Sequence, residues 1–222
     1  MPDMASGTSI FDPALCELMY KWFCPEGGAI LDPFAGGSVR GIVAHLLGYK
    51  YTGIELRPEQ VESNREQAKL LLPPDNQPTW ICGDSDKVLD TLEGNEYDFI
   101  FSCPPYFNLE VYSDLEDDLS TMSYNNFLEK YQSIIKKAHY LLINGGYEVF
   151  VVGDVRDERG YYVDFIGETK KAFMNPFLVG AKLYNDIILL DPIGTAMIRA
   201  RNTFNSKKVV KVHQNILCFK KL

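Results

Sequence analysis

The chain has 222 residues, of which 46% are hydrophobic and 23% are charged, and its formal net charge is −8. These values are typical of a globular domain, and because no apolar run approaches the roughly 18 residues of a membrane span, we expect no membrane segment. The five cysteines form no CxxC pair and the three histidines are scattered, which argues against a disulfide scaffold and against a metal site. The polar amino terminus lacks the regions of a signal peptide, so the sequence predicts a cytoplasmic protein.

The charge is unevenly distributed along the chain. Residues 193–222 contain no acidic residue and seven basic ones, Arg199, Arg201, Lys207, Lys208, Lys211, Lys220 and Lys221. This tail therefore carries +7, and subtracting that from −8 leaves −15 for residues 1–192. A basic strip on an acidic body still binds phosphates, because charge interactions are screened beyond about 8–10 Å. A solvated basic face is the alternative interpretation.

Strand and helix patterns alternate from residue 11 to residue 101. A helix is predicted over 11–23, where Asp12 is the N-cap and Pro13 lies in the first turn. Further helices are predicted over 39–47 and 58–72, and a short one ends at Leu92. Short apolar strands are predicted over 29–32, 49–54, 79–82 and 97–101.

The second half of the chain has longer elements. Helices are predicted over 125–142 and 164–174, and residues 144–146, Asn-Gly-Gly, are expected to cap the first of them. Strands are predicted over 147–152, 183–190 and 209–219. The stretch 107–123 is too long for a routine turn, so we expect a functional loop there. The stretch 191–208 is predicted to be a mobile loop.

This alternation indicates an α/β fold with a doubly wound parallel sheet, in one domain over residues 1–222. Right-handed crossovers place the carboxyl ends of the strands along one edge. Asp32, Glu55 and Asp84 each follow such a strand end. We therefore expect the three acids to be exposed at that edge, close to the turn at 103–106.

Residues 98–106 read DFIFSCPPY, and they end a predicted strand abruptly. Proline has no amide hydrogen and fixes its own φ, so Pro104 and Pro105 hold an extended turn at the carboxyl end of the strand. In an open α/β sheet, ligands bind at that edge. A rigid carbonyl beside the aromatic face of Tyr106 suits a flat ring that bears an amino group. An ordinary Pro-Pro turn with a packed tyrosine is the alternative.

Residues 32–38, DPFAGGS, form the loop after the first strand. The loop is neither GxGxxG nor a P-loop, so phosphate binding is poorly supported. The three strand-end acids favour a ligand with an ammonium group, a ribose diol and an exocyclic amine, as in S-adenosyl-L-methionine. Glu55 lies about 20 residues beyond the loop, where a ribose-binding acid is expected. A nicotinamide cofactor would use the same Glu55, but its pyrophosphate does not suit the aspartate that begins the loop. Each acid singly is also explained as a helix N-cap or a solvated charge.

Two motifs of this chain resemble those of the DNA amino-methyltransferases, which modify adenine N6 or cytosine N4. The DPFAGGS loop is similar to the DPFxGSG cofactor motif, and residues 102–106, SCPPY, are similar to the (D/N/S)PPY catalytic motif. Residues 9–23 resemble the amino-terminal segment that closes the cofactor site, and residues 213–220 resemble the last strand of that fold. The chain looks most like the small phage-type DNA methylases, and this resemblance implies a location in a bacterial host cell or its nucleoid. It departs from the family at Cys103, where the family has Asp, Asn or Ser, and in the Gly-Gly-Ser of the loop.

The resemblance implies a Rossmann-like S-adenosylmethionine-dependent methyltransferase fold with seven strands, the last antiparallel, and no large separate recognition domain. It implies catalytic roles for Ser102, Cys103, Pro104, Pro105 and Tyr106. The implied cofactor-binding residues are Phe11, Asp32, Pro33, Phe34, Ala35, Gly36, Gly37, Ser38, Glu55, Leu56, Asp84 and Ser85. Candidate DNA contacts are the loops 107–123 and 191–208 and the side chains of Arg199, Arg201, Lys207, Lys208 and Lys211.

The leading hypothesis is a site-specific DNA methyltransferase, as in restriction-modification systems, that acts on a flipped-out base stacked on Tyr106. Two acceptors, the Pro104 carbonyl with either Cys103 or Ser102, would draw the lone pair of the amino nitrogen out of the ring. No metal is expected. The alternatives are a protein-glutamine or RNA methyltransferase with the same turn, and an inactive cofactor-binding module. Cytosine-C5 methylation by a cysteine is disfavoured, because by resemblance it uses a Pro-Cys order that this sequence lacks. The choice of adenine or cytosine, the recognition sequence, a cognate restriction enzyme and the oligomeric state stay open.

Overall fold

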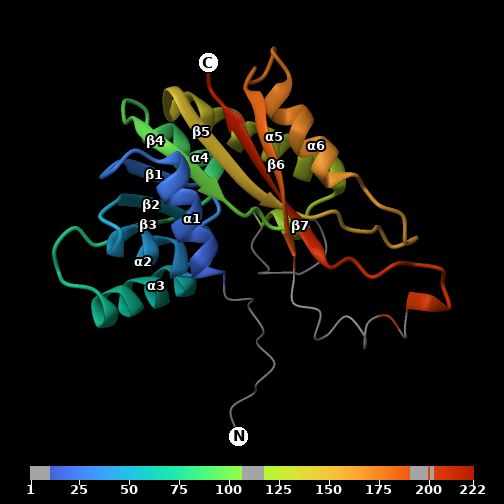
Figure 1. The fold of residues 1–222 in the computed structure, drawn as a ribbon, viewed down its shortest axis with the longest axis horizontal. Coiled ribbons are helices and arrows are strands. Elements are labelled where there is room, and N and C mark those ends of the chain that lie inside the picture. The colour runs from blue at the N-terminus through green and yellow to red at the C-terminus, as the bar shows by residue number, and fades with distance from the viewer. Residues whose placement is uncertain (1–10, 107–117, 191–199, 201–202) are drawn as a thin grey trace, which may run out of the picture.

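The computed structural model describes residues 11–106, 118–190, 200 and 203–222. Its centre is a seven-stranded sheet with the strand order β3-β2-β1-β4-β5-β7-β6 (Figure 1). The strands are β1 (Ala29–Asp32), β2 (Lys50–Glu55), β3 (Thr79–Cys82), β4 (Tyr97–Ser102), β5 (Leu142–Val152), β6 (Lys182–Leu190) and β7 (His213–Lys220). Neighbouring strands from β3 to β5 are parallel, whereas β7 is antiparallel to both β5 and β6. The predicted α/β class and the antiparallel last strand are confirmed.

Two groups of helices cover the two faces of this sheet. One face carries α1 (Pro13–Phe23), α2 (Val39–Leu46) and α3 (Pro58–Leu71), and the other carries α4 (Ser85–Thr91), α5 (Tyr124–Leu141) and α6 (Phe165–Met174). A 3₁₀ turn, η1 (Leu119–Thr121), precedes α5. Successive residues of a strand point to opposite faces, so Phe99 and Phe101 pack with the first group while Ile100 packs with the second. The doubly wound arrangement is therefore confirmed.

Most predicted elements agree closely with the structure, and β5 shows the clearest difference. The strand begins at Leu142 rather than at Tyr147, because Leu142 pairs with Tyr97. The Asn-Gly-Gly segment does not cap α5 as predicted. Instead the Gly145 amide donates to the carbonyl of Lys221 at 3.0 Å, and the Lys221 amide donates to the carbonyl of Gly146 at 3.0 Å. The end of the chain thus extends the sheet pairing across a segment that looks like a turn in the sequence.

The order of the strands determines where a ligand can bind. The chain runs outward from β1 through β2 to β3, then returns to the other side of β1 to form β4 and β5. Loops after β1 and β4 therefore diverge in opposite directions and leave a crevice at the carboxyl ends of these strands. Much of the predicted loops 107–123 and 191–208, including Arg199 and Arg201, lies outside the described residues.

Candidate active site

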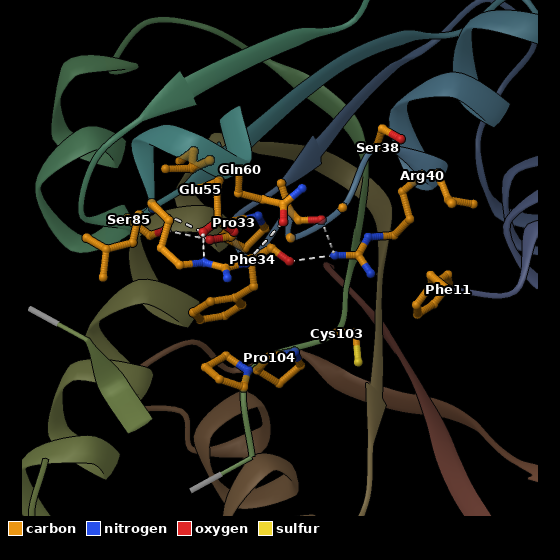
Figure 2. Close-up of a pocket in the computed structure, with 18 of the residues that line it drawn as sticks. Phe11, Pro33, Phe34, Ser38, Arg40, Glu55, Gln60, Ser85, Cys103 and Pro104 are labelled. Carbon is orange, nitrogen blue, oxygen red and sulfur yellow. Dashed lines mark hydrogen bonds and ion pairs between the residues drawn. The ribbon is translucent and has the colours of Figure 1, made fainter. Parts of the chain in front are cut away.

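The carboxyl ends of β1 to β4 surround a cavity of about 880 Å³ (Figure 2). Its wall contains the predicted cofactor loop, the ends of β2 and β3 and the predicted catalytic turn, which come from distant parts of the chain. The predicted residues in this wall are Phe11, Pro33, Phe34, Ala35, Gly36, Gly37, Ser38, Glu55, Leu56, Asp84, Ser85, Cys103, Pro104, Pro105 and Tyr106. Asp32 and Ser102 are not part of the wall.

Asp32 is completely buried, so the prediction of an exposed acid is wrong for this residue. Its Oδ2 accepts hydrogen bonds from Nε of Arg40 at 2.5 Å and from the hydroxyl of Tyr51 at 2.7 Å. Burial, followed by the nearby carboxylate, holds the pKa of Tyr51 well above its ordinary value, so the hydroxyl stays a donor. Because a buried charge must be paired and hydrogen-bonded, Asp32 supports the loop from beneath rather than facing a ligand.

Ser102 is also completely buried, at the end of β4. Its hydroxyl donates to Oδ1 of Asp32 at 2.6 Å and accepts from the amide of Phe34 at 3.1 Å. Ser102 thus joins the ends of β1 and β4 and does not face the cavity. Of the two predicted side-chain acceptors, only Cys103 lies in the cavity wall.

Glu55 lies in the wall with one carboxylate oxygen engaged. Oε1 accepts from the backbone amide and from Nε of Arg57, both at 3.0 Å. Among the described residues, no hydrogen bond to Oε2 is found. The carboxylate is therefore held in place by Arg57 and retains an acceptor for a hydroxyl group in the cavity.

Asp84 is buried, which corrects the prediction that it is an open acid. It is the N-cap of α4, and its Oδ1 accepts from the amide of Asp86 at 3.1 Å. Its Oδ2 lies 3.0 Å from Nζ of Lys130, which reaches it from α5. The neighbouring Ser85 hydroxyl donates to the carbonyl of Pro33, so α4 is tied to the cofactor loop.

Cys103 is half-buried in the cavity wall at the start of the predicted catalytic turn. Burial raises the pKa of its thiol, while Arg40 and a hydrogen bond from the Tyr106 side chain oppose that rise. The net shift is upward, so the thiol is protonated at neutral pH. A thiol is a weak donor and acceptor, and only the thiolate is a strong nucleophile.

The hydroxyl of Tyr106 accepts a hydrogen bond from Nε2 of Gln214 in β7, and both residues line the cavity. Gln214 is not identified by the sequence pattern, because only the antiparallel insertion of β7 brings it to this edge. Arg40 is also missed there. It lies in the first turn of α2 and lines the cavity, with its Cζ 4.6 Å from the ring centre of Phe11. The sequence signal that could have revealed Arg40 is an arginine that closely follows a glycine loop.

The three lysines of the basic tail that are candidate DNA contacts do not form one exposed strip. Lys207 is exposed, whereas the Nζ atom of Lys208 lies against Gly160. The Nζ atom of Lys211 is buried. It lies 3.7 Å from the position that a Cβ would take if Gly153 carried a side chain, and the Tyr106 hydroxyl lies at the same distance from that position.

Within the described part of the chain, no helix could span a bilayer and no group of three or more His, Cys, Asp or Glu is placed to hold a metal.

Residues 8–66 match a family model of N6/N4 methyltransferases that is described as DNA methylase. The matched segment includes α1, the loop after β1 and Glu55. Over these residues the chain is similar to the DNA amino-methyltransferase family. This family match confirms the resemblance that the DPFAGGS loop indicates. A comparison with curated proteins finds no match.

Several solved methyltransferases share the fold. TrmN from Thermus thermophilus is 16% identical, with a TM-score of 0.62, and the match covers 96% of this chain but only 49% of TrmN. The magnesium protoporphyrin IX methyltransferase ChlM from Synechocystis PCC 6803, solved with bound SAM, is 12% identical, with a TM-score of 0.58 over 95% of this chain and 79% of ChlM. A putative rRNA-methylase from Clostridium thermocellum is 16% identical, with a TM-score of 0.58 over 96% of this chain and 100% of its own. The chain thus has the Rossmann-like fold of S-adenosylmethionine-dependent methyltransferases, and it spans about half the length of TrmN.

Proposed function

We propose that this protein transfers a methyl group from S-adenosyl-L-methionine to the exocyclic amino group of adenine or cytosine in DNA. The observation that carries this proposal is the single cavity whose wall contains both the DPFAGGS loop and the Cys103–Tyr106 turn. One motif supplies a place for the methyl donor and the other a place for the amino group. The family match over residues 8–66 supports DNA as the substrate.

The residues of the cavity fit the cofactor. When bound, S-adenosylmethionine supplies a methyl group on a positively charged sulfur. Glu55 has an acceptor oxygen directed by the Arg57 contacts, which suits a ribose diol. The loop ends at α2, whose N-cap residue Ser38 makes no side-chain capping hydrogen bond, so backbone amides of this helix end remain for a ligand.

The catalytic turn acts on the amino group by hydrogen bonding rather than by covalent catalysis. The lone pair of an exocyclic amine is delocalised into the ring, so the nitrogen is a poor nucleophile. Acceptors aimed at the amino hydrogens, the Pro104 carbonyl and the Cys103 sulfur, draw the lone pair back onto nitrogen. The raised pKa of the Cys103 thiol disfavours a thiolate nucleophile and therefore cytosine-C5 chemistry.

A base in a stacked duplex cannot reach this cavity, so the target base is flipped out. The Tyr106 ring is held by Gln214 through its hydroxyl and makes a T-shaped contact with the ring of Phe165 at a centroid distance of 6.4 Å. A ring held in this way offers a fixed face for stacking. We propose that Tyr106 stacks on the flipped base and that Lys207, with the predicted loops, contacts phosphates of the duplex.

The experiment that tests this function uses cofactor labelled on the methyl group, with DNA, RNA and a mixed protein extract as separate substrates. We expect label in DNA, and loss of that label in Tyr106→Ala. Tyr140→Ala is the matched control, because Tyr140 is an exposed tyrosine of α5 outside the cavity wall. Label in RNA or protein but not in DNA would contradict the proposed substrate. No transfer at all by a folded protein would instead favour an inactive binding module.

A further inference from the structure

The guanidinium of Arg40 is buried, and the protein satisfies only part of its hydrogen-bonding capacity. Arginine has five N–H donors. The Nε donor is used by Asp32 at 2.5 Å, and Nη2 donates to the carbonyl oxygens of Phe34 and Ala35. Among the described residues, no hydrogen bond from Nη1 is found. Two donors of a residue that is only 4% exposed are therefore left for a group inside the cavity that Arg40 lines.

The position of these donors is well defined. Figure 2 shows the guanidinium between the loop and Phe11, with the second terminal nitrogen turned away from the loop carbonyls, on the side of Phe11 and Cys103. The ring of Phe11 lies 4.6 Å from Cζ of Arg40. A ring and three engaged donors leave the guanidinium little freedom, so Nη1 presents its hydrogens in one direction. Arg40 lines the cavity, and its guanidinium can make charge-assisted hydrogen bonds, which favours a strong acceptor at this place.

The sheet order indicates which part of the cofactor lies here. Along the edge, Asp84 and Ser85 follow β3, Glu55 ends β2, the loop follows β1, and Cys103 follows β4. If Glu55 holds the ribose of the cofactor and the adenine of the cofactor extends toward β3, its amino-acid portion extends the other way, toward β1 and β4. That is the region of Arg40 and Phe11. The only anionic group of S-adenosylmethionine is the carboxylate of this amino-acid portion.

We propose that Arg40 binds the carboxylate of the cofactor's amino-acid portion through Nη1, and that buried Asp32 orients the guanidinium for this contact. The uncapped amino end of α2 adds to the attraction for an anion. Asp32, the first residue of the DPFAGGS loop, is then a positioning residue, and Arg40 of α2 makes the contact with the carboxylate. This inference rests on the proposed function, because it requires that S-adenosylmethionine occupies the cavity.

The test compares three ligands by calorimetry: S-adenosylmethionine, decarboxylated S-adenosylmethionine, which lacks only the carboxylate, and 5′-methylthioadenosine, which lacks the whole amino-acid portion. We expect the wild type to bind the carboxylated cofactor at least about tenfold more tightly than the decarboxylated one, as for a charge-assisted hydrogen bond. Arg40→Gln is combined with Asp32→Asn, so that no uncompensated charge stays buried. This double variant should bind the two cofactors about equally and keep its affinity for methylthioadenosine. Arg40→Lys, which keeps the charge, should lose most of the preference and serves if the double variant does not fold.

Glu55→Ala is the matched control, because a ribose contact is common to all three ligands. It should weaken all three and leave the ratio of the two cofactor affinities unchanged. Equal binding of the two cofactors by the wild type would overturn the inference, as would a preference that survives both Arg40 variants. Equal weakening of all three ligands in these variants would also overturn it, because Arg40 would then only brace the loop. If none of the three ligands binds the wild type, the proposed function itself fails.

Discussion

Gln214 donates a hydrogen bond of 2.5 Å to the hydroxyl of Tyr106, although 108 positions separate them in the chain. Tyr106 follows β4, and Gln214 lies in β7, which pairs with β5 on the far side. The antiparallel insertion of the last strand therefore places a side-chain amide against the predicted catalytic turn. If the Tyr106 ring stacks on the target base, this bond fixes the plane of stacking.

We predict that Tyr106→Phe and Gln214→Leu act as a unit. Both substitutions remove the Tyr106–Gln214 hydrogen bond, which contributes about 0.5–1.5 kcal/mol, so Gln214→Leu should lower kcat/KM for DNA by about two- to tenfold. Tyr106→Phe also removes the hydroxyl that donates to Cys103 and should lower it by at least as much. The double variant should lose about as much as Tyr106→Phe alone. Steady-state kinetics of the four proteins measure this coupling, and fully additive losses would show that the bond does not matter in turnover.

We predict that Cys103→Ser stays active. The wild-type thiol has a raised pKa because it is buried, so it is protonated at neutral pH. A serine hydroxyl is a better acceptor than a thiol and should support methyl transfer at the wild-type rate or faster. Cys103→Ala removes the acceptor and should be slower by about tenfold, the effect of about one hydrogen bond to a developing charge. An inactive Cys103→Ser protein that still binds cofactor and DNA, with a covalent adduct trapped in the wild type, would overturn the mechanism.

We predict that the lysines of the tail differ in their contribution to DNA binding. Lys207 is exposed, whereas Nζ of Lys211 is buried close to Gly153 and Tyr106. Lys207→Ala should therefore reduce the slope of log affinity against log salt by about 0.9, the value for one phosphate. Lys211→Ala should leave that slope unchanged. DNA affinities measured over a range of salt concentrations test both statements, and equal slopes for all three proteins would mean that Lys207 is merely solvated.

We predict a pH-dependent stability difference at Glu148. Glu148 is completely buried against Nδ1 of His139 at 2.6 Å, and burial raises the pKa of its carboxyl above the ordinary value of 4.5. As pH rises past 4.5, the unfolded chain releases this proton before the folded protein does. The contribution of Glu148 to stability is therefore present below that pH and is lost as pH rises through the raised value.

Glu148→Gln cannot undergo this loss, so its stability relative to the wild type should increase between about pH 4 and pH 8. Urea unfolding at a series of pH values measures the difference. Glu158→Gln, at an exposed position, is the control and should follow the wild-type curve. A constant difference between Glu148→Gln and the wild type across this range would contradict the assignment.

The fold could be predicted from the sequence because short apolar strands alternate with helices, most of which begin at a capping side chain or a proline. Asp12 and Pro13 at the start of α1 show this directly, since Asp12 accepts from the amide of Ala14 at 2.8 Å. The start of β5 could not be predicted. Its first residues pair with the end of the chain through Lys221, and a local Asn-Gly-Gly pattern carries no information about that partner.

The candidate site was predictable to the extent that strand ends determine it. Glu55 and the turn at Cys103 lie in the cavity wall as the parallel-sheet rule predicts. The burial of Asp32 and Asp84 was not predictable, because it depends on basic side chains from other elements that pair with them. Arg40 comes from the next helix and Lys130 from α5. Whether a strand-end carboxylate faces a ligand or a buried cation is decided by the tertiary structure.

The most direct test of the central claim identifies the methylated atom in DNA. Unmethylated DNA is treated with the wild type and S-adenosylmethionine, digested to nucleosides and analysed by mass spectrometry against standards. The account predicts N6-methyladenine or N4-methylcytosine, lost in Tyr106→Ala and kept in Cys103→Ser. DNA that carries only C5-methylcytosine, or no methylated base while the methyl group reaches another substrate, would contradict it.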